Sequence, residues 1–600
     1  MSGWHGSRRV FLKSLGLGAA VFTASCATKP QKVKNTDRPN VILIMTDDQG
    51  YGDFGVTGNP IIKTPNIDAM ASRSGSMKNF HVHPVCAPTR ACLMTGRYNY
   101  RTRVVDTYVG RAMMEPEETT VAEILHQAGY ATGIFGKWHL GDSYPLRPMD
   151  QGFDESLVHR GGGIGQPADP EGGEGKYTDP ILLDNGKLKQ CKGYCTDVYF
   201  ERATAWMAKC TAQNKSFFAY IPTNAPHGPF HDVPEDLLAE YKKMNLGNDR
   251  FPQDKGHPLP EKSDEDKRAR IFAMITNVDD NVGRLFEKLD RLGLTENTIV
   301  MFMVDNGPNG RRYVAGMKGN KSHVHEGGIR SPLFVHWPGV VEPGHSSDRI
   351  AAHIDLLPTI LDACGVEKPA GLRLDGRSLL PLWKGRQVDW PDRMIVIQSH
   401  RGDKPVLYHN FAARTQKWKL LNASGFGNET LKGEPKFELY DMASDPLEEH
   451  NLAQKRPDMV EKMRKRYELW FRDVGSTRPD NYAPPRIHVG TEHENPVVLT
   501  RQDWRHIKDK PWAPKSNGYW ELYAAASGKY DVKLRFPELK ADARATLDVA
   551  GKRLNAQIQK GAAEYIFEAV SISRGDIRLL AAITTGQETR GPWKVDVLRR

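Results

Sequence analysis

The amino-acid sequence predicts an α/β protein in which helices cover both faces of a largely parallel sheet. From about residue 38 to residue 369, short apolar runs typical of buried strands alternate with helical patterns, the clearest over 120–128 and 269–292. Because ligands bind beyond the carboxyl ends of such strands, polar residues that follow the runs are expected to form one site. Four apolar runs lead directly into metal-binding or proton-transferring residues: 41–45, 131–135, 217–221 and 299–304.

Two smaller folded segments are predicted after the main domain, which we place at 38–375. Residues 376–476 contain short strands and a helical pattern over 458–471, as in a small α+β subdomain. Residues 477–600 begin with a proline-containing linker and continue with strand-like runs separated by turns, which predicts an added β-sandwich. These runs are 518–524, 528–535, 543–549, 565–572, 576–582 and 593–598.

The composition is that of a globular protein with a basic character. The 600 residues are 39% hydrophobic and 26% charged, and the formal net charge is +10. This charge favours an anionic partner, which could be nucleic acid, an anionic membrane surface or a sulfated or phosphorylated glycan. The sequence has no run of Lys and Arg and no recognisable nucleic-acid-binding module, so we expect no nucleic-acid partner.

The first 37 residues predict export. Arg8 and Arg9 precede a short, weakly hydrophobic stretch over 15–22, which resembles a bacterial twin-arginine signal and is too short to span a membrane permanently. Cys26, followed by a polar tether, resembles a lipoprotein acylation site, and simple cleavage near residues 24–27 is the alternative. We therefore expect a bacterial periplasmic or cell-surface protein whose only membrane contact is a lipid anchor at Cys26.

Oxygen ligands for a metal follow two of the predicted strands. Asp47 and Asp48 come directly after the first apolar run, and Asp305 and Asn306 directly after the last. Either pair alone is more often a helix cap or a turn, but two pairs at equivalent strand ends favour a metal site. Carboxylate and amide oxygens suit calcium or magnesium better than zinc or copper.

A cysteine stands at the start of a predicted helix. Residues 86–97 read CAPTRACLMTGR, in which Pro88 suits the first helical turn and Gly96 can end the helix. Cys86 is then expected at the helix N terminus, where free N–H groups and the helix dipole favour an anion. Two other cysteines, Cys191 and Cys195, flank a short polar turn that suits a local disulfide.

The pattern Cys86-x-Pro88-x-Arg90, followed by Thr95-Gly96-Arg97, resembles the signature of type I sulfatases, a family of the alkaline phosphatase superfamily. The resemblance covers about residues 38–476 and implies an alkaline-phosphatase-like mixed sheet between helices and the hydrolysis of sulfate esters. In this family a maturation enzyme acts on the unfolded cysteine segment and oxidises the cysteine to formylglycine, whose hydrate supplies the nucleophilic oxygen.

Further motifs of the family match at the predicted strand ends. Residues 46–53 and 305–307 resemble its two metal segments, 136–141 its Lys/His pair at the sulfate, and 225–229 its leaving-group histidine. A family lysine precedes the motif at 326–330 by five positions, which selects Lys321 over Lys318. The implied metal site, for calcium or alternatively magnesium, comprises Asp47, Asp48, Cys86, Asp305 and Asn306. The implied catalytic residues are Cys86, Arg90, Lys137, His139, His227 and Lys321.

The resemblance also implies a role for each catalytic side chain. Lys137, Lys321 and the cation stabilise the negative charge of the sulfate, and Arg90 holds the hydrated formylglycine. His227 protonates the departing oxygen, with Lys321 as a second candidate. His139 then removes the proton whose loss expels sulfate and regenerates the aldehyde.

Export, the basic charge and the added β-sandwich point to a sulfated polysaccharide or oligosaccharide as the substrate. Candidate binding residues near the glycine-rich loop over 161–179 and the other motifs are Arg160, His231, Arg312, Lys318 and His323. Aromatic residues of the sandwich either bind carbohydrate or pack the sandwich against the subdomain: Trp504, Trp512, Tyr519 and Trp520. The alternatives are a phosphodiesterase or phosphonate monoester hydrolase with the same cysteine signature, and an inactive glycan-binding protein.

Overall fold

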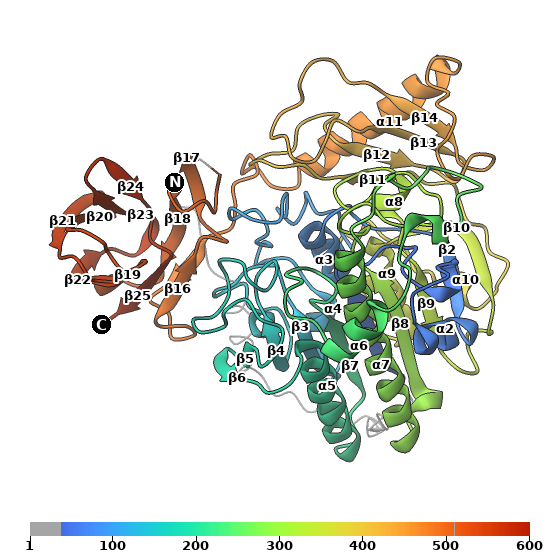
Figure 1. The fold of residues 1–600 in the computed structure, drawn as a ribbon, viewed down its shortest axis with the longest axis horizontal. Helices are drawn as coiled ribbons and strands as arrows, with labels where there is room; N and C mark the ends of the chain where they lie inside the picture. Colours follow the sequence, from blue (N-terminus) through green and yellow to red (C-terminus); the bar gives the residue numbers. More distant parts are fainter. Residues whose placement is uncertain (1–37, 509) are drawn as a thin grey trace, which may run out of the picture.

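The computed structural model describes residues 38–508 and 510–600, so the predicted export signal and Cys26 lie outside the described residues. Three bodies of secondary structure are visible: a large sheet with its helices, a small sheet with one long helix, and a β-sandwich (Figure 1). Within the described ranges, no helix combines the length and the apolar character that crossing a membrane requires.

The large sheet has ten strands, and the four predicted ones lie next to one another at its centre. They are β8 (Thr298–Val304), β1 (Asn40–Thr46), β7 (Phe217–Pro222) and β3 (Ala131–Lys137), in that order and all parallel. Antiparallel strands at both sides make the sheet mixed. The other strands are β2 (Gly75–His81), β4 (Glu155–His159), β5 (Ile181–Asp184), β6 (Lys187–Gln190), β9 (Leu333–His336) and β10 (Ser346–Ala352).

Both faces of this sheet are buried under helices, because its central strands present apolar side chains alternately to each side. In β1, Ile42 and Ile44 pack with the helices of one face, whereas Leu43 and Met45 pack with those of the other. The first face is covered by α2 (Pro65–Ser72), α5 (Cys195–Ala212) and α7 (Glu265–Arg291). The second is covered by α3 (Cys86–Thr95), α4 (Val121–Gln127) and α9 (Leu356–Ala363).

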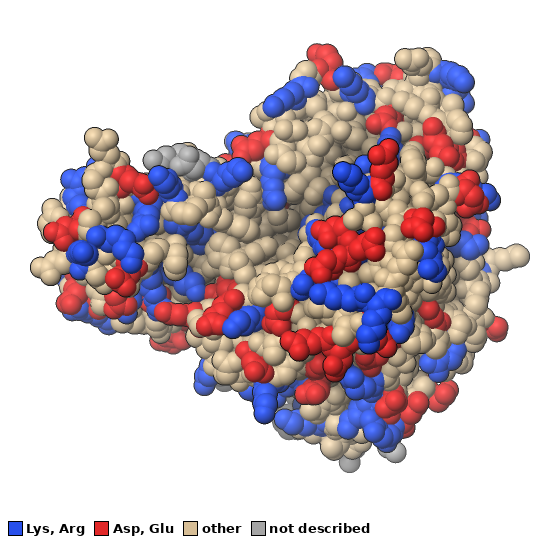
Figure 2. All heavy atoms as spheres, in the orientation of Figure 1, with Lys and Arg blue, Asp and Glu red and all other residues tan. Residues whose placement is uncertain are grey.

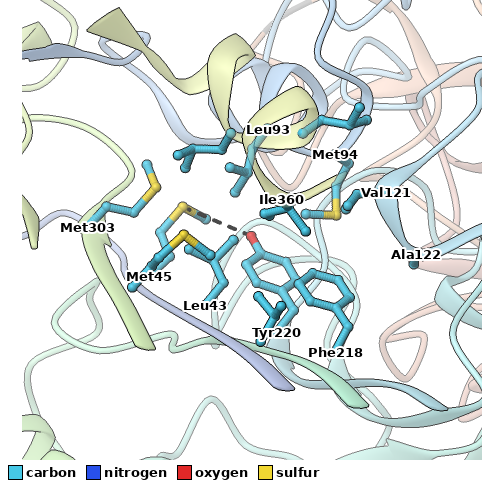
Figure 3. Close-up of a cluster of buried hydrophobic side chains, with 14 of the residues drawn as sticks. Leu43, Met45, Leu93, Met94, Val121, Ala122, Phe218, Tyr220, Met303 and Ile360 are labelled. Carbon is cyan, nitrogen blue, oxygen red and sulfur yellow. Dashed lines mark hydrogen bonds between the residues drawn. The ribbon is translucent and has the colours of Figure 1, made fainter. Parts of the chain in front are cut away.

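The second face matters for the site because it seats α3. Figure 3 shows Leu93 and Met94 of α3 in one apolar cluster with Leu43 of β1, Phe218 of β7 and Ile360 of α9. All ten residues of α3 are buried. The N terminus of α3 is therefore fixed against the carboxyl ends of β1 and β8. Three short helices complete the main body: α6 (Glu235–Tyr241), α8 (Glu326–Ile329) and α10 (Leu380–Trp383).

The small sheet follows the main body and is antiparallel. Its strands are β11 (Ile395–Gln398), β12 (Phe411–Arg414), β13 (Trp418–Asn422) and β14 (Glu438–Asp441). The predicted helix at 458–471 is α11 (Pro457–Gly475), and it packs on this sheet through Met463 and Tyr467.

The β-sandwich consists of two mainly antiparallel sheets around one apolar core. The six predicted runs are strands β18 (Asn517–Ala524), β19 (Gly528–Arg535), β20 (Ala543–Val549), β22 (Glu564–Ile572), β23 (Gly575–Thr585) and β25 (Lys594–Arg599). Five further strands were not predicted: β15 (Ile487–Val489), β16 (Val497–Thr500), β17 (Arg505–Lys508), β21 (Lys552–Ile558) and β24 (Glu588–Arg590).

The aromatic residues of the sandwich fall into two groups. Trp504 and Trp520 are fully buried in the core of the sandwich itself, a position that neither expected alternative described. Tyr519 is half-buried beneath the guanidinium of Arg578, 4.1 Å from the ring centre. Trp512 is half-buried and meets Tyr108 of the main body edge to face, with ring centres 5.3 Å apart.

The sandwich is joined to the main body by shared core as well as by polar contacts. Met113 and Leu146 of the main body belong to the apolar cluster of the sandwich. Lys594 Nζ donates to the Asp169 carbonyl, and Tyr144 N–H donates to Glu494. The surface is recessed between the sandwich and the rest of the molecule, and charged side chains are sparse in this recess (Figure 2).

Candidate active site

The two pairs of expected metal ligands meet at the carboxyl ends of β1 and β8, as predicted from their positions after apolar runs. Asp47, Asp48, Asp305 and Asn306 are all fully buried. The Asp48 N–H donates to Asp305 Oδ1 at 3.2 Å, and Asn306 Nδ2 donates to Asp48 Oδ1 at 2.9 Å. Asp48 has a φ of 63°, a left-handed conformation that non-glycine residues adopt at a cost and that is frequent at functional sites.

Several oxygens of this cluster have no donor. Asp47 Oδ1, Asp48 Oδ2 and Asn306 Oδ1 are buried and accept no hydrogen bond from the described residues. Ligand atoms of Asp47, Cys86 and Asp305 lie within 4.8 Å of one another. Buried oxygens without donors are costly unless a cation compensates them. The donor set consequently fits a hard divalent cation, and its composition is that preferred by calcium or magnesium.

Cys86 is the first residue of α3, and Gly96, in the left-handed conformation, ends this helix as predicted. The thiol is unpaired and only 3% exposed, and burial raises its pKa. Arg90, one turn later and fully buried, donates to the Lys137 carbonyl at 2.8 Å and to Asp305 Oδ2 at 2.9 Å. Arg90 thus ties the cysteine helix to β3 and β8.

The two candidate lysines at 318 and 321 are separated by the structure. Lys321 Nζ forms an ion pair with Asp48, whereas Lys318 Nζ lies 3.1 Å from Glu438 of the small sheet. Burial disfavours the charged form of Asp48, but Lys321 and His227 outweigh it and lower the Asp48 pKa. Lys137, at the end of β3, pairs with Asp47 in the same cluster. Burial instead raises the pKa of Asp305, to about 7, with Asp47 as a further cause.

The two histidines beside the cluster carry their ring protons on different nitrogens. His139 Nε2 donates to the Thr107 carbonyl at 2.7 Å, because a carbonyl can only accept, and its Nδ1 has no partner among the described residues. His227 Nδ1 donates to the Gly228 carbonyl at 2.7 Å, and its Nε2 lies 3.7 Å from Asp48 Oδ2. Burial and Lys137 lower the pKa of His139 far below its ordinary value, so the ring is neutral at physiological pH.

The glycine-rich loop between β4 and β5 lies against both histidines. A methyl group added to Gly162 would sit 3.0 Å from His139 Nε2, and one added to Gly163 would sit 2.7 Å from His227 Cε1. Such separations are shorter than van der Waals contact. The absence of side chains at these two positions lets the backbone pack on the imidazole rings.

The expected substrate-binding residues have different surroundings. Arg160 is 9% exposed and donates to the Asp142 carbonyl at 3.4 Å, on the side that faces the β-sandwich. Its neighbours include Asp142 and Asp503, whose carboxylates it affects electrostatically. His231 and His323 are exposed, and His323 Nδ1 lies 3.2 Å from the Lys321 carbonyl.

Arg312 is part of a buried ion pair. It is 6% exposed and forms a bidentate ion pair with Asp53, with Nη2 to Oδ2 at 2.6 Å. It also donates to the Asp48 carbonyl at 3.0 Å and to the Asn309 carbonyl at 2.9 Å. Its guanidinium therefore holds the backbone of the metal segment, and a contact between Arg312 and the substrate stays a prediction.

A buried charged network beside the site was not predicted from the sequence. Glu326, which served only as a marker for Lys321, pairs with Lys419 at 2.9 Å, Arg330 at 2.7 Å and His81 at 3.2 Å. Lys419 also pairs with Glu448 at 2.6 Å. The network connects α8 to the small sheet and so supports the loop that carries Lys321.

The structure also shows the surroundings of three other cysteines. Cys191 and Cys195 are both unpaired, so the local disulfide is not formed here. Cys92 lies near His83 and His353, close enough for a metal. However, His353 Nδ1 accepts from the Ile354 N–H at 3.1 Å, which places the proton of the neutral ring on Nε2 and does not suit metal binding.

Comparison with known proteins identifies related sequences over most of the described chain. A sulfatase family model matches residues 39–366, and a model described as N-sulphoglucosamine sulphohydrolase, C-terminal, matches residues 319–470. Human arylsulfatase A is 31% identical over 453 residues, which cover 69% of this chain and 83% of the relative. Rat N-acetylgalactosamine-6-sulfatase is 29% identical over 399 residues, covering 62% of this chain and 68% of the relative.

Bacterial relatives and solved structures give the same result. The N-acetylglucosamine-6-O-sulfatase of Bacteroides thetaiotaomicron is 27% identical over 512 residues, covering 72% of this chain and 86% of the relative. The crystal structure of Ps i-CgsB in complex with k-i-k-neocarrahexaose superposes with a TM-score of 0.63 at 26% identity. That match covers 75% of this chain and 95% of the solved chain.

Proposed function

This chain belongs to the sulfatase family of the alkaline phosphatase superfamily and is a sulfuric ester hydrolase, and from that premise we propose that it desulfates a sulfated oligosaccharide or polysaccharide. The observation that carries the proposal is the meeting of Cys86, Asp47 and Asp305 within 4.8 Å. Lys137 is paired to Asp47, and Lys321 is paired to the neighbouring Asp48. This arrangement places cationic groups and oxygen ligands next to the N terminus of α3, where a sulfate can bind.

We propose that Asp47, Asp48, Asp305 and Asn306, together with residue 86, hold a divalent cation, calcium in preference to magnesium. When bound, this cation polarises a sulfate oxygen and favours the ionised form of the attacking hydroxyl. The oxygens without donors in this cluster support the assignment. We further propose that Cys86 is converted to formylglycine, the source of the attacking oxygen, and that Arg90 orients it.

In this proposal the remaining residues bind the sulfate and move protons. The ammonium groups of Lys137 and Lys321 move away from their carboxylate partners far enough to bind sulfate oxygens. Their positive charge then stabilises the transition state. His227, whose Nε2 faces the cluster, protonates the departing sugar oxygen. His139, with its Nδ1 unprotonated, accepts the proton whose removal releases sulfate.

The sugar substrate is supported by the relatives. Two of them are named N-acetylgalactosamine-6-sulfatase and N-acetylglucosamine-6-O-sulfatase, and Ps i-CgsB was solved in complex with k-i-k-neocarrahexaose. The recess between the sandwich and the main body provides room for a chain of sugars (Figure 2). The candidates for contacts with these sugars are Arg160, His231, Arg312, Lys318 and His323.

We also propose an export and maturation route and a domain division that the sequence pattern supports. The first 37 residues direct twin-arginine export, with Cys26 as a lipid anchor, after a maturation enzyme has acted on Cys86. We assign 38–375 to the catalytic domain, 376–476 to the subdomain, and 477–600 to the linker and accessory sandwich.

The test is ion-resolved release of sulfate and phosphate from a panel of sulfated glycans and phosphodiesters. The protein is produced with formylglycine verified by mass spectrometry, and compared with Cys86→Ala and with Cys191→Ala as the matched control. We expect sulfate release that is lost in Cys86→Ala and kept in Cys191→Ala. Phosphate release alone would move the assignment to phosphodiesterases or phosphonate monoester hydrolases, and release of neither would favour a glycan-binding protein.

A further inference from the structure

The Thr107 carbonyl determines which nitrogen of His139 can act as a base. It accepts the Nε2 proton of His139 at 2.7 Å, which leaves the lone pair of the neutral ring on Nδ1. His139 Nδ1 is buried and has no hydrogen-bond partner among the described residues. Any movement of Thr107 would therefore rotate the His139 ring or remove the hydrogen bond that favours this tautomer.

The same carbonyl accepts a second hydrogen bond, from a residue of the C-terminal region. Gln502 Nε2 donates to Thr107 O at 2.9 Å, and Gln502 is 1% exposed. Two further contacts hold the same loop to the sandwich: the Gly110 N–H donates to Gln502 O at 3.2 Å, and Arg505 Nη1 donates to Val109 O at 3.1 Å. Gln502 lies beyond residue 470, where the matches to the family models end.

The loop at 105–111 depends on these contacts because it contains no helix or strand of its own. On the opposite side, Arg401 forms an ion pair with Asp106 and donates to Thr107 Oγ1 at 2.8 Å. The Arg401 guanidinium also stacks on the Tyr108 ring, 3.9 Å from its centre. The loop is thus clamped between the subdomain and the sandwich, with His139 beneath it.

We propose that Gln502 is a positioning residue for the sulfatase reaction, and that the β-sandwich thereby completes the active site. By fixing the Thr107 carbonyl, Gln502 holds His139 Nδ1 in the orientation in which it accepts a proton. The inference rests on the proposed role of His139. Without Gln502, the carbonyl keeps a single donor and the loop loses one of its three hydrogen bonds to residues 502–505.

The test compares Gln502→Leu and Gln502→Glu with Gln557→Leu, an exposed glutamine of β21 that serves as the matched control. In Gln502→Leu we expect kcat to fall about tenfold or more, because small misplacements of a catalytic group are costly. KM should fall with kcat and leave kcat/KM nearly unchanged, because only the step after departure of the sugar is slowed. Since His139 serves the release of sulfate, the desulfated sugar should appear in a burst that precedes steady sulfate release. Gln557→Leu should match the wild type.

The isosteric variant separates positioning from simple anchoring. The Gln502→Glu carboxylate cannot donate to Thr107 near neutral pH, but it can when protonated, so its activity relative to wild type should rise as the pH falls. The inference is overturned if Gln502→Leu keeps the wild-type kcat, or if it only lowers the melting temperature and the active fraction without a burst or a changed pH profile. If the wild type itself releases no sulfate while its formylglycine is intact, the proposed function fails and this inference fails with it.

Discussion

A buried histidine next to the cysteine segment should make folding sensitive to acid. His83 is fully buried, and its Nδ1 lies 3.0 Å from Ser399 Oγ. Its backbone N–H donates to the hydroxyl of Thr89 in α3 at 3.0 Å. Burial lowers the pKa of His83 from 6.5 to about 3. The folded protein therefore keeps this ring neutral at pH values where an unfolded chain would protonate it.

The sign and size of the effect follow from this difference. Because the folded pKa is below the unfolded one, stability is complete above pH 6.5 and is lost as the pH falls toward the folded pKa. Between about pH 7.5 and about pH 5 the contribution of one such histidine is about 2 kcal/mol. This free energy hardly depends on the exact pKa of His83 in the folded protein. At about pH 5 the pH is still well above that pKa, so only the unfolded chain takes up the proton.

The measurement is the free energy of unfolding in urea at the two pH values, for the wild type and for His83→Asn. The cavity left by the substitution costs stability equally at both, so it cancels from the pH dependence. We expect the wild type to lose about 2 kcal/mol more than the variant on acidification. His231→Asn, which replaces an exposed histidine, should behave as the wild type. Equal losses in His83→Asn and wild type would refute the reasoning.

Three further predictions concern the site. Removal of divalent cations with a chelator should abolish sulfate release and calcium should restore it, as followed by elemental analysis and activity together; full activity in verified metal-free protein would contradict the metal assignment. Lys321→Met should lower kcat/KM by about two to three orders of magnitude, as expected for a charge on the transition state, and Lys318→Met by much less; the reverse order would contradict the placement of the two lysines. Gly163→Ala should lower kcat/KM because the new methyl group would sit 2.7 Å from His227 Cε1, whereas Gly427→Ala, with no atom within 4 Å, should not. Equal kcat/KM for Gly163→Ala and the wild type would show that the loop can shift without moving His227.

The core of the fold was accessible to sequence reasoning because its signal is local. Strands β1, β3, β7 and β8 are almost entirely buried, so their residues form continuous apolar runs. Strand β21 was missed because its side chains are mostly exposed and its sequence, KRLNAQI, carries no such run. The order in which the strands pair was not predicted, because pairing joins residues that are far apart in the sequence.

The candidate site was predictable only where a side chain itself carries the chemistry. Arg312 was expected to meet the substrate, but its partner Asp53 is 259 positions away in the sequence, and no local pattern reveals that pair. No sequence pattern identifies the Thr107 carbonyl as important, because every residue has a backbone carbonyl. Its importance comes from the two donors, His139 and Gln502, that reach it from distant parts of the chain.

The complete burial of α3 has a consequence for how the enzyme is produced. Cys86 is 3% exposed in the first turn of a helix whose every residue is buried, so an enzyme acting on this cysteine after folding would have to extract the helix from the core. If Cys86 is converted to formylglycine as proposed, a molecule that folds with an unmodified thiol is trapped in that form. The fraction of active protein in a preparation should be set during synthesis, and later exposure of folded protein to the maturation machinery should not raise it unless the chain is first unfolded.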